Sequence, residues 1–113
     1  MEAKDIILKA IQHRTSDNPI NNNELAQLCR SYGFNLSTER VREEIRLMRK
    51  DGILILSQAS AGGGYYMSRS MDDYLKFRNT NLLPRVIDIQ DTIKLMDYSA
   101  KREYKMDAQA RLF

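Results

Sequence analysis

The sequence is poor in the residue types on which many functions depend. Among its 113 residues are one cysteine, Cys29, and one histidine, His13. A single cysteine excludes an internal disulfide framework and fits a reducing cytoplasm, where we expect the protein to lie. A zinc site with one cysteine and one histidine would need several carboxylates, and none has suitable spacing. We therefore expect no metal and no cofactor.

Long hydrophobic runs are also missing. No apolar stretch approaches the roughly 18 residues that span a bilayer. Charged residues of both signs fill the N-terminal segment 1–5, which lacks a signal-peptide pattern. We expect no membrane association. The net charge of +3 permits nucleic-acid binding without requiring it, because many basic proteins bind no nucleic acid.

No constellation of residues predicts an enzyme or a small-molecule substrate. His13 has no nucleophile or acid near it in the sequence, as a catalytic base would need. The run Gly62-Gly63-Gly64 lacks the following Lys-Ser/Thr of a phosphate-binding loop and precedes a strand. The pair Asp72-Asp73 is explained by a helix start, and the pair Asp88/Asp91 by solvent exposure.

Hydrophobic spacing predicts three helices in the first half of the chain. The first covers 3–14, and a short extended piece at Pro19-Ile20 follows it. The second begins at Asn21, which forms a capping box with Glu24. Its expected buried face has the helical spacing i, i+3, i+4, i+7 and consists of Leu25, Leu28, Cys29 and Tyr32. After a turn at 33–36, Ser37 caps a third helix over 38–51.

A β-hairpin and further helices are predicted after position 52. The strands are 53–56 and 64–68, joined by a glycine-rich tip. A helix starts at Ser70, and Pro84 predicts a break near 79–82 before a longer helix. In that helix an apolar seam alternates four and three residues, as in a heptad repeat, and we expect it to form a homodimer. The alternative is that the helix folds back and completes the core of the monomer. The seam consists of Leu82, Val86, Ile89, Ile93 and Met96.

The third helix carries the main functional signal, an outer face rich in basic residues. Residues near the start of such a helix usually reach DNA base edges, and basic residues further along clamp phosphates. The candidates for base edges are Thr38, Arg40, Arg42 and Glu43. The candidates for phosphate are Ser37, Arg46, Arg49, Lys50, Ser60 at the hairpin tip and Arg69 after the hairpin.

The same helix also permits a reading without DNA. Residues 37–52 hold five basic and four acidic residues, for a net charge of about +1. Glu39 with Arg42, and Glu43 with Arg46, have the i, i+3 spacing of pairs that decorate a solvated face. The hairpin tip, 58–63, has no lysine or arginine.

Residues 3–78 resemble a winged helix-turn-helix domain, and more narrowly the small winged-helix proteins of bacteriophages and prophages. The resemblance lies in Asn18-Pro19-Ile20, Glu24-Leu25-Ala26, Arg40-Val41-Arg42-Glu43, Arg49-Lys50-Asp51-Gly52-Ile53 and Gly64-Tyr65-Tyr66-Met67-Ser68. It implies DNA binding in phage gene control or replication, inside a bacterial host. The uncharged hairpin tip departs from the usual pattern, and residues 82–113 lie outside the resemblance.

The sequence thus predicts a mainly α protein with a small β-hairpin, an α+β fold. We expect a winged helix-turn-helix domain at 1–78 and a C-terminal helical extension at 79–113 that serves for dimerisation. The leading interpretation is a sequence-specific protein that binds double-stranded DNA and regulates transcription or replication. The alternative is a winged-helix module that binds and modulates a host protein, because winged helices serve both roles.

Overall fold

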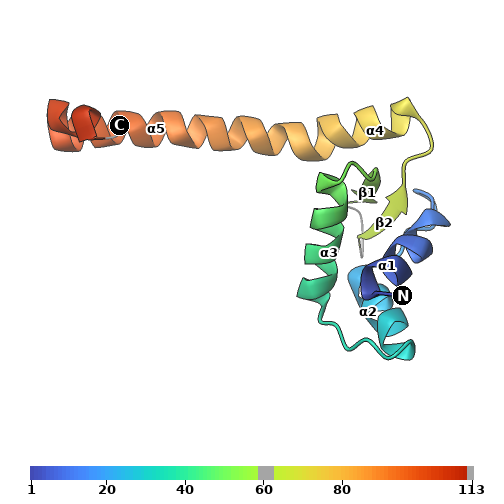
Figure 1. Ribbon diagram of the computed structural model, residues 1–113. Coiled ribbons are helices and arrows are strands. Elements are labelled where there is room, and N and C mark those ends of the chain that lie inside the picture. The colour runs from blue at the N-terminus through green and yellow to red at the C-terminus, as the bar shows by residue number, and fades with distance from the viewer. Residues whose placement is uncertain (59–62, 112–113) are drawn as a thin grey trace. The chain divides into compact units, whose positions relative to one another are not determined.

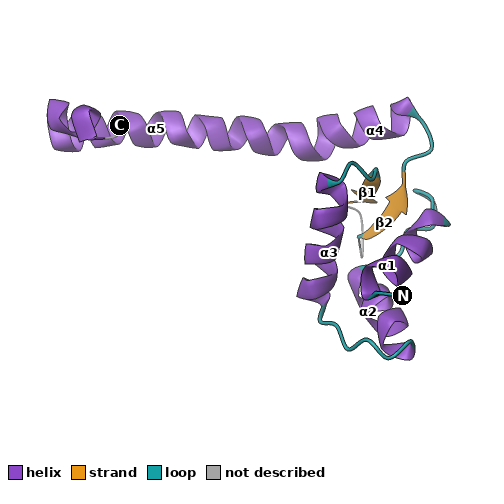
Figure 2. Cartoon of the chain, in the orientation of Figure 1, coloured by secondary structure: helices purple, strands orange, loops and turns teal. Residues whose placement is uncertain are grey.

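The computed structural model describes residues 1–58 and 63–111, with side-chain surroundings described as far as residue 104. The chain divides into two compact units, Met1–Phe77 and Arg78–Phe113, each considered by itself below. It is mainly helical, with one small antiparallel hairpin (Figures 1 and 2). None of the helices in these two stretches is long and apolar enough to cross a membrane.

Three helices build the core of the first unit: α1 (Ala3–Gln12), α2 (Asn22–Ser31) and α3 (Thr38–Lys50). The predicted caps of α2 and α3 are confirmed. The Asn21 side chain accepts a hydrogen bond from the Glu24 amide at 2.8 Å, and Ser37 Oγ accepts one from the Arg40 amide at 3.1 Å. These side chains satisfy amides that have no partner within the helix, and they fix where each helix begins.

The predicted end of the first helix was wrong by two residues. α1 ends at Gln12, so His13 and Arg14 lie beyond it. The Arg14 amide donates to the Ile11 carbonyl at 2.9 Å, and the Arg14 carbonyl accepts from the Met67 amide at 3.3 Å. The chain leaves the helix here because the carbonyl of Arg14 bonds to Met67 of the hairpin instead of continuing the helix.

The core is formed by one apolar face from each helix. Its fully buried side chains include Ile7, Ile11, Leu25, Cys29, Val41 and Ile45. The expected burial of Tyr32 was wrong, because α2 ends at Ser31 and Tyr32 is 62% exposed. Ala26, which the spacing did not single out, is buried instead.

Cys29 is a core residue without a disulfide partner. Burial raises the pKa of its thiol, which lowers the reactive thiolate fraction at neutral pH. We expect Cys29→Ala to lower the free energy of unfolding by about 1 kcal/mol, in the range for removing a small buried group. Urea denaturation measures this change. Rapid labelling of the native protein by a thiol reagent would contradict the burial.

The hairpin consists of β1 (Ile55–Gln58) and β2 (Gly64–Met67), paired from Ile55↔Met67 to Gln58↔Gly64. The first strand was predicted two residues too early. The Ile53 amide donates a hydrogen bond to the Met48 carbonyl of α3 at 3.1 Å. Because Ile53 is still bonded to the end of the helix, pairing with β2 begins only at Ile55.

An extended segment before α2 joins the edge of this hairpin, as expected for Pro19-Ile20. The Ile20 amide donates to the Tyr65 carbonyl at 3.0 Å, and the Tyr65 amide donates to the Ile20 carbonyl at 2.8 Å. Gly64 makes this approach possible. Its φ is +149°, and a Cβ atom there would lie 2.7 Å from Cβ of Pro19.

The predicted interruption of the helix at 79–82 is present as a change of helix type and not as a loop. Helix α4 (Met71–Phe77) is followed by a π-helical segment, η1 (Arg78–Leu82), and then by α5 (Leu83–Arg111), with no loop residue assigned between them. Pro84 has no amide hydrogen, and its ring would clash with the carbonyl four residues earlier, at Thr80. A wider π turn at this position accommodates the proline where an α-helical turn could not.

Candidate nucleic-acid interface

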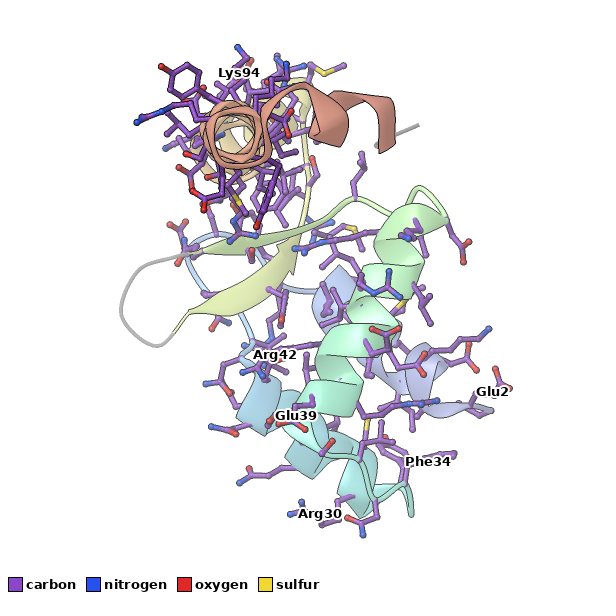
Figure 3. All side chains as sticks on the ribbon, turned by 90° about the vertical axis from the view of Figure 1, so that its left-hand side faces the viewer. Glu2, Arg30, Phe34, Glu39, Arg42 and Lys94 are labelled. Carbon is purple, nitrogen blue, oxygen red and sulfur yellow. The ribbon has the colours of Figure 1, made fainter. Side chains whose placement is uncertain are left out.

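Helix α3 is placed so that one face is buried and the other is open. Gly33, with φ of +92°, lets the chain leave α2 in a left-handed conformation, and Ser37 starts α3. Val41, Ile45 and Met48 are buried against the core. Figure 3 looks toward α3 and labels Glu39 and Arg42, both of which are exposed.

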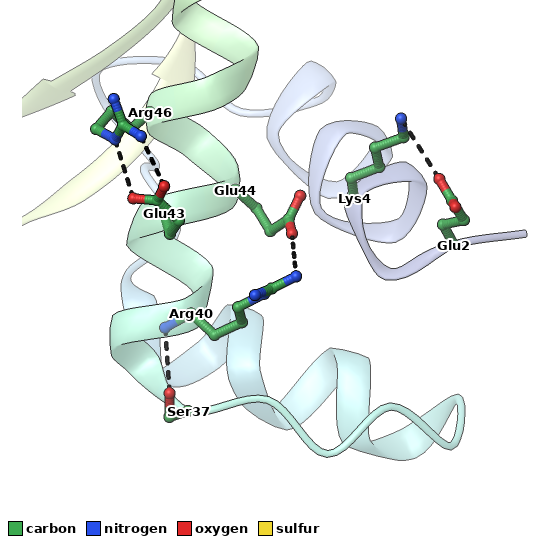
Figure 4. A network of polar contacts seen from close by, with 7 residues as sticks. All are labelled: Glu2, Lys4, Ser37, Arg40, Glu43, Glu44 and Arg46. Carbon is green, nitrogen blue, oxygen red and sulfur yellow. Dashed lines mark hydrogen bonds and ion pairs between the residues drawn. The ribbon is translucent and has the colours of Figure 1, made fainter.

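Two of the five basic side chains on α3 form ion pairs within the helix (Figure 4). Arg40 Nη2 lies 3.2 Å from Glu44 Oε1. Arg46 binds both carboxylate oxygens of Glu43, from Nε at 2.9 Å and from Nη2 at 2.7 Å. The predicted Glu43–Arg46 pair is therefore confirmed. The Arg40–Glu44 pair was missed, although its i, i+4 spacing was visible in the sequence.

The Glu43–Arg46 pair is charged at neutral pH. The hydrogen bond from Arg46 lowers the pKa of Glu43, and the nearby positive charges of Arg40 and Lys50 add to this effect. The same hydrogen bond raises the pKa of Arg46. Because the pKa of Glu43 is lowered, the pair is lost only as the pH falls through that lowered value. Both side chains are solvent-exposed, and such pairs exchange partners at little cost.

Arg42 and Lys50 differ from these paired residues. Both are exposed, and neither side chain forms a hydrogen bond or an ion pair with the side chains described in 1–58 and 63–104 or with the described backbone. The predicted Glu39–Arg42 pair does not form among these residues. Arg42 lies one turn from the start of α3, where side chains reach base edges in helix-turn-helix proteins, and Lys50 lies at the opposite end.

Arg49 has a different position from the one predicted for a phosphate ligand. Its Nε donates to the Ile55 carbonyl at 2.8 Å in a partly buried hydrogen bond. Its guanidinium carbon lies 5.8 Å from the ring centre of Tyr65 and 5.4 Å from that of Phe77. These distances are typical of cation–π contacts, so Arg49 links α3, β1, β2 and α4 instead of facing solvent.

Arg69 is also engaged within the first unit. Its Nη2 donates to the Gln12 carbonyl at 2.6 Å and to the Arg14 carbonyl at 3.3 Å. A positive charge at the C-terminal end of α1 satisfies carbonyls that the helix leaves unpaired. A phosphate bound by Arg69 would therefore compete with these two carbonyls for the guanidinium group, which the sequence did not reveal.

The other predicted DNA contacts are Ser37 and Thr38 at the start of α3 and Ser60 at the hairpin tip. Ser37 is exposed, and its hydroxyl oxygen accepts from Arg40 while its proton stays available to a phosphate. Thr38 is half-buried at the first position of α3. Ser60 lies outside the described residues. At the edge of the hairpin, the Gln58 side-chain amide donates to the Ser16 carbonyl.

Glu43→Gln provides a test of how the ion pairs limit binding. The substitution frees Arg46 and removes a negative charge, so we expect non-specific DNA affinity to rise about threefold to tenfold, as one added phosphate contact would give. Fluorescence anisotropy with a random duplex measures it. Glu39→Gln changes the net charge equally without freeing an arginine. Equal gains from the two variants would mean that the freed guanidinium contributes nothing.

The described part of the chain contains no group of three His, Cys, Asp or Glu side chains that could hold a metal ion. No protein-family model matches the chain, and neither a curated protein nor a solved structure matches it significantly.

Proposed function

We propose that the chain is a sequence-specific double-stranded DNA-binding protein of the phage type, a regulator of transcription or replication. In this proposal the first unit is a winged helix-turn-helix domain that reads the major groove with α3. The observation that carries it is Arg42, an exposed cation with no ion-pair partner in the described part of the chain, near the start of a helix whose other face is buried in the core. An arginine there can bind guanine O6 and N7 through two hydrogen bonds.

The arrangement of the first unit supports the proposal. Its order is three helices and then a hairpin, and the extended segment at Ile20 pairs with that hairpin. The turn between α2 and α3 leaves the basic face of α3 open. A helix of this kind fits the major groove, which is about 12 Å wide.

The residues take different roles in this proposal. Thr38, Arg40 and Arg42 face the bases, and Glu43 accepts a hydrogen bond from a cytosine amino group. Ser37, Arg46 and Lys50 face phosphates, where they set register and contribute salt-dependent affinity. Arg40 and Arg46 must exchange their glutamate partners for DNA. The exposure of both side chains in the Glu43–Arg46 pair permits this exchange, whereas Glu44, the partner of Arg40, has a side chain that is only 15% exposed.

A second candidate function is binding to a host protein without DNA. The two ion pairs and the inward position of Arg49 favour it, because they reduce the positive charge that α3 presents. Mixed-charge helix faces of this type also serve as protein-binding surfaces.

Fluorescence anisotropy with duplexes from the genome of origin separates the two functions. The proposal expects binding to duplex DNA that weakens steeply as salt rises, with a preferred sequence that survives competitor DNA. Absence of binding to any duplex at low salt would favour the protein-binding function. Binding with a steep salt dependence but no sequence preference would remove the base-reading role of α3.

A further inference from the structure

The second unit contains an apolar stripe along a helix that also exposes Ile87, Leu95 and Tyr98 beside it. Within α5 and the residue before it, large hydrophobic side chains recur every four and three residues. Their exposed fractions are 38% for Leu82, 48% for Val86, 59% for Ile89, 53% for Ile93 and 66% for Met96. Ala100, which is half-buried, continues the same spacing. In heptad terms these residues occupy alternating d and a positions of a helix-pairing seam.

We propose that this seam pairs with the seam of a second copy of the chain, and that the two helices run antiparallel. The observation that selects this partner is that large and small side chains of the seam are matched when its sequence is read against itself in reverse. Leu82 is large and Ala100 is small, so two copies complement each other only when the ends are exchanged. Such pairing is isologous, because each contact occurs twice around a two-fold axis.

Antiparallel alignment forms three kinds of layer, each with a matched pair of side chains. Leu82 faces Ala100 of the second copy, Val86 faces Met96, and Ile89 faces Ile93. Facing large and small residues in this way fills the space between two helices without gaps. Parallel alignment would set Ala100 against Ala100 and leave a gap, and it would place Ile89 at a d position, where isoleucine disfavours two-stranded pairing.

The residues beside the seam are compatible with antiparallel pairing, because it brings no like charges together. Gln90 and Thr92 flank its centre, and each meets its own copy across the two-fold axis. Both side chains are uncharged and can donate as well as accept hydrogen bonds. The charged neighbours Arg85 and Asp97 face Ser99 and Leu83 of the second copy, so no like charges meet. Thr92 Oγ1 lies 2.9 Å from the Asp88 carbonyl of its own helix, to which it donates.

The alignment sets where the two chains enter the helix pair. Residue 78, where the first unit joins the second, lies level with residue 104 of the other copy. At 1.5 Å per residue, the two copies of residue 78 are about 39 Å apart along the pair. Parallel helices would place the two copies of residue 78 side by side.

Cysteine cross-linking of the full chain tests the orientation. Leu82→Cys and Ala100→Cys are made in a Cys29→Ala background and oxidised alone and as an equal mixture, without DNA. A disulfide requires Cα atoms about 4.4–6.8 Å apart, which antiparallel layers provide only between the two different variants. We therefore expect cross-linked dimers in the mixture and few in either variant alone. If these variants fail to fold, Ile89→Cys with Ile93→Cys tests the central layer.

Light scattering at tens of micromolar tests the pairing itself. We expect a dimer for the native chain, a monomer for Ile93→Asp, and a dimer for Lys94→Asp, which introduces the same side chain beside the seam (Lys94 is labelled in Figure 3). A monomeric native chain, three or more copies, or efficient cross-linking of Ala100→Cys with itself would each overturn the proposal. Because no DNA is present, these results stand apart from any failure to bind DNA.

Discussion

Arg49→Ala is expected to lower the free energy of unfolding by about 2–5 kcal/mol, the largest effect of any arginine on α3. The substitution removes a charged hydrogen bond to the Ile55 carbonyl and leaves that carbonyl without its donor, which costs about 1.5–3 kcal/mol. It also removes contacts with the rings of Tyr65 and Phe77, worth about 0.5–2 kcal/mol. Urea denaturation monitored by circular dichroism measures the change.

Arg46→Ala is the matched control, because it removes the same side chain from the exposed face of the same helix. We expect it to leave the stability nearly unchanged, as is usual for exposed surface pairs. If Arg49→Ala were as stable as the native protein and lost DNA affinity, the contacts of Arg49 with Ile55, Tyr65 and Phe77 would not stabilise the fold. Arg49 would then belong with the phosphate ligands, as the sequence first suggested.

Arg42→Ala is expected to weaken binding to the preferred DNA sequence by about 10–100-fold, equivalent to about 1–3 kcal/mol, and to relax preference at one base position. The reason is that Arg42 alone among the arginines on the outer face of α3 has no intramolecular ion pair among the described residues. Anisotropy titrations with the preferred duplex and single-base variants measure both effects.

Lys50→Ala distinguishes phosphate contact from base reading. We expect it to weaken binding to all sequences alike and to reduce the slope of log affinity against log salt by about 1. A uniform loss from Arg42→Ala, with the same drop in slope, would show that Arg42 meets phosphate and reads no base.

Local signals in the sequence predicted the first unit well where a side chain acts on its own backbone. Asn21 and Ser37 cap helices as expected, and Leu25 and Cys29, on the predicted face of α2, are buried. Such contacts join residues at most a few positions apart, so a linear pattern contains them. The extended piece at Pro19-Ile20 was also anticipated, and in the structure Ile20 pairs with the hairpin.

Several contacts that the sequence did not predict join residues far apart along the chain. Arg49 and Arg69 are of a residue type that often binds phosphate. In the structure their hydrogen-bond acceptors are backbone carbonyls, of Ile55 for Arg49 and of Gln12 and Arg14 for Arg69. The partners of Arg69 lie 57 and 55 positions away along the chain, and periodicity contains no such information. The π turn at 78–82 escaped prediction for another reason, because a proline signals a disturbed helix without specifying a loop or a wider turn.

The close approach of Gly64 to Pro19 fixes one end of the hairpin to the segment before α2. Any side chain at position 64 would collide with the proline ring and push β2 away from Ile20. Gly64 begins β2 and pairs with Gln58, whose side-chain amide donates to the Ser16 carbonyl, so both strands are held at this end. A single methyl group added at position 64 would therefore separate two segments that lie far apart in the sequence.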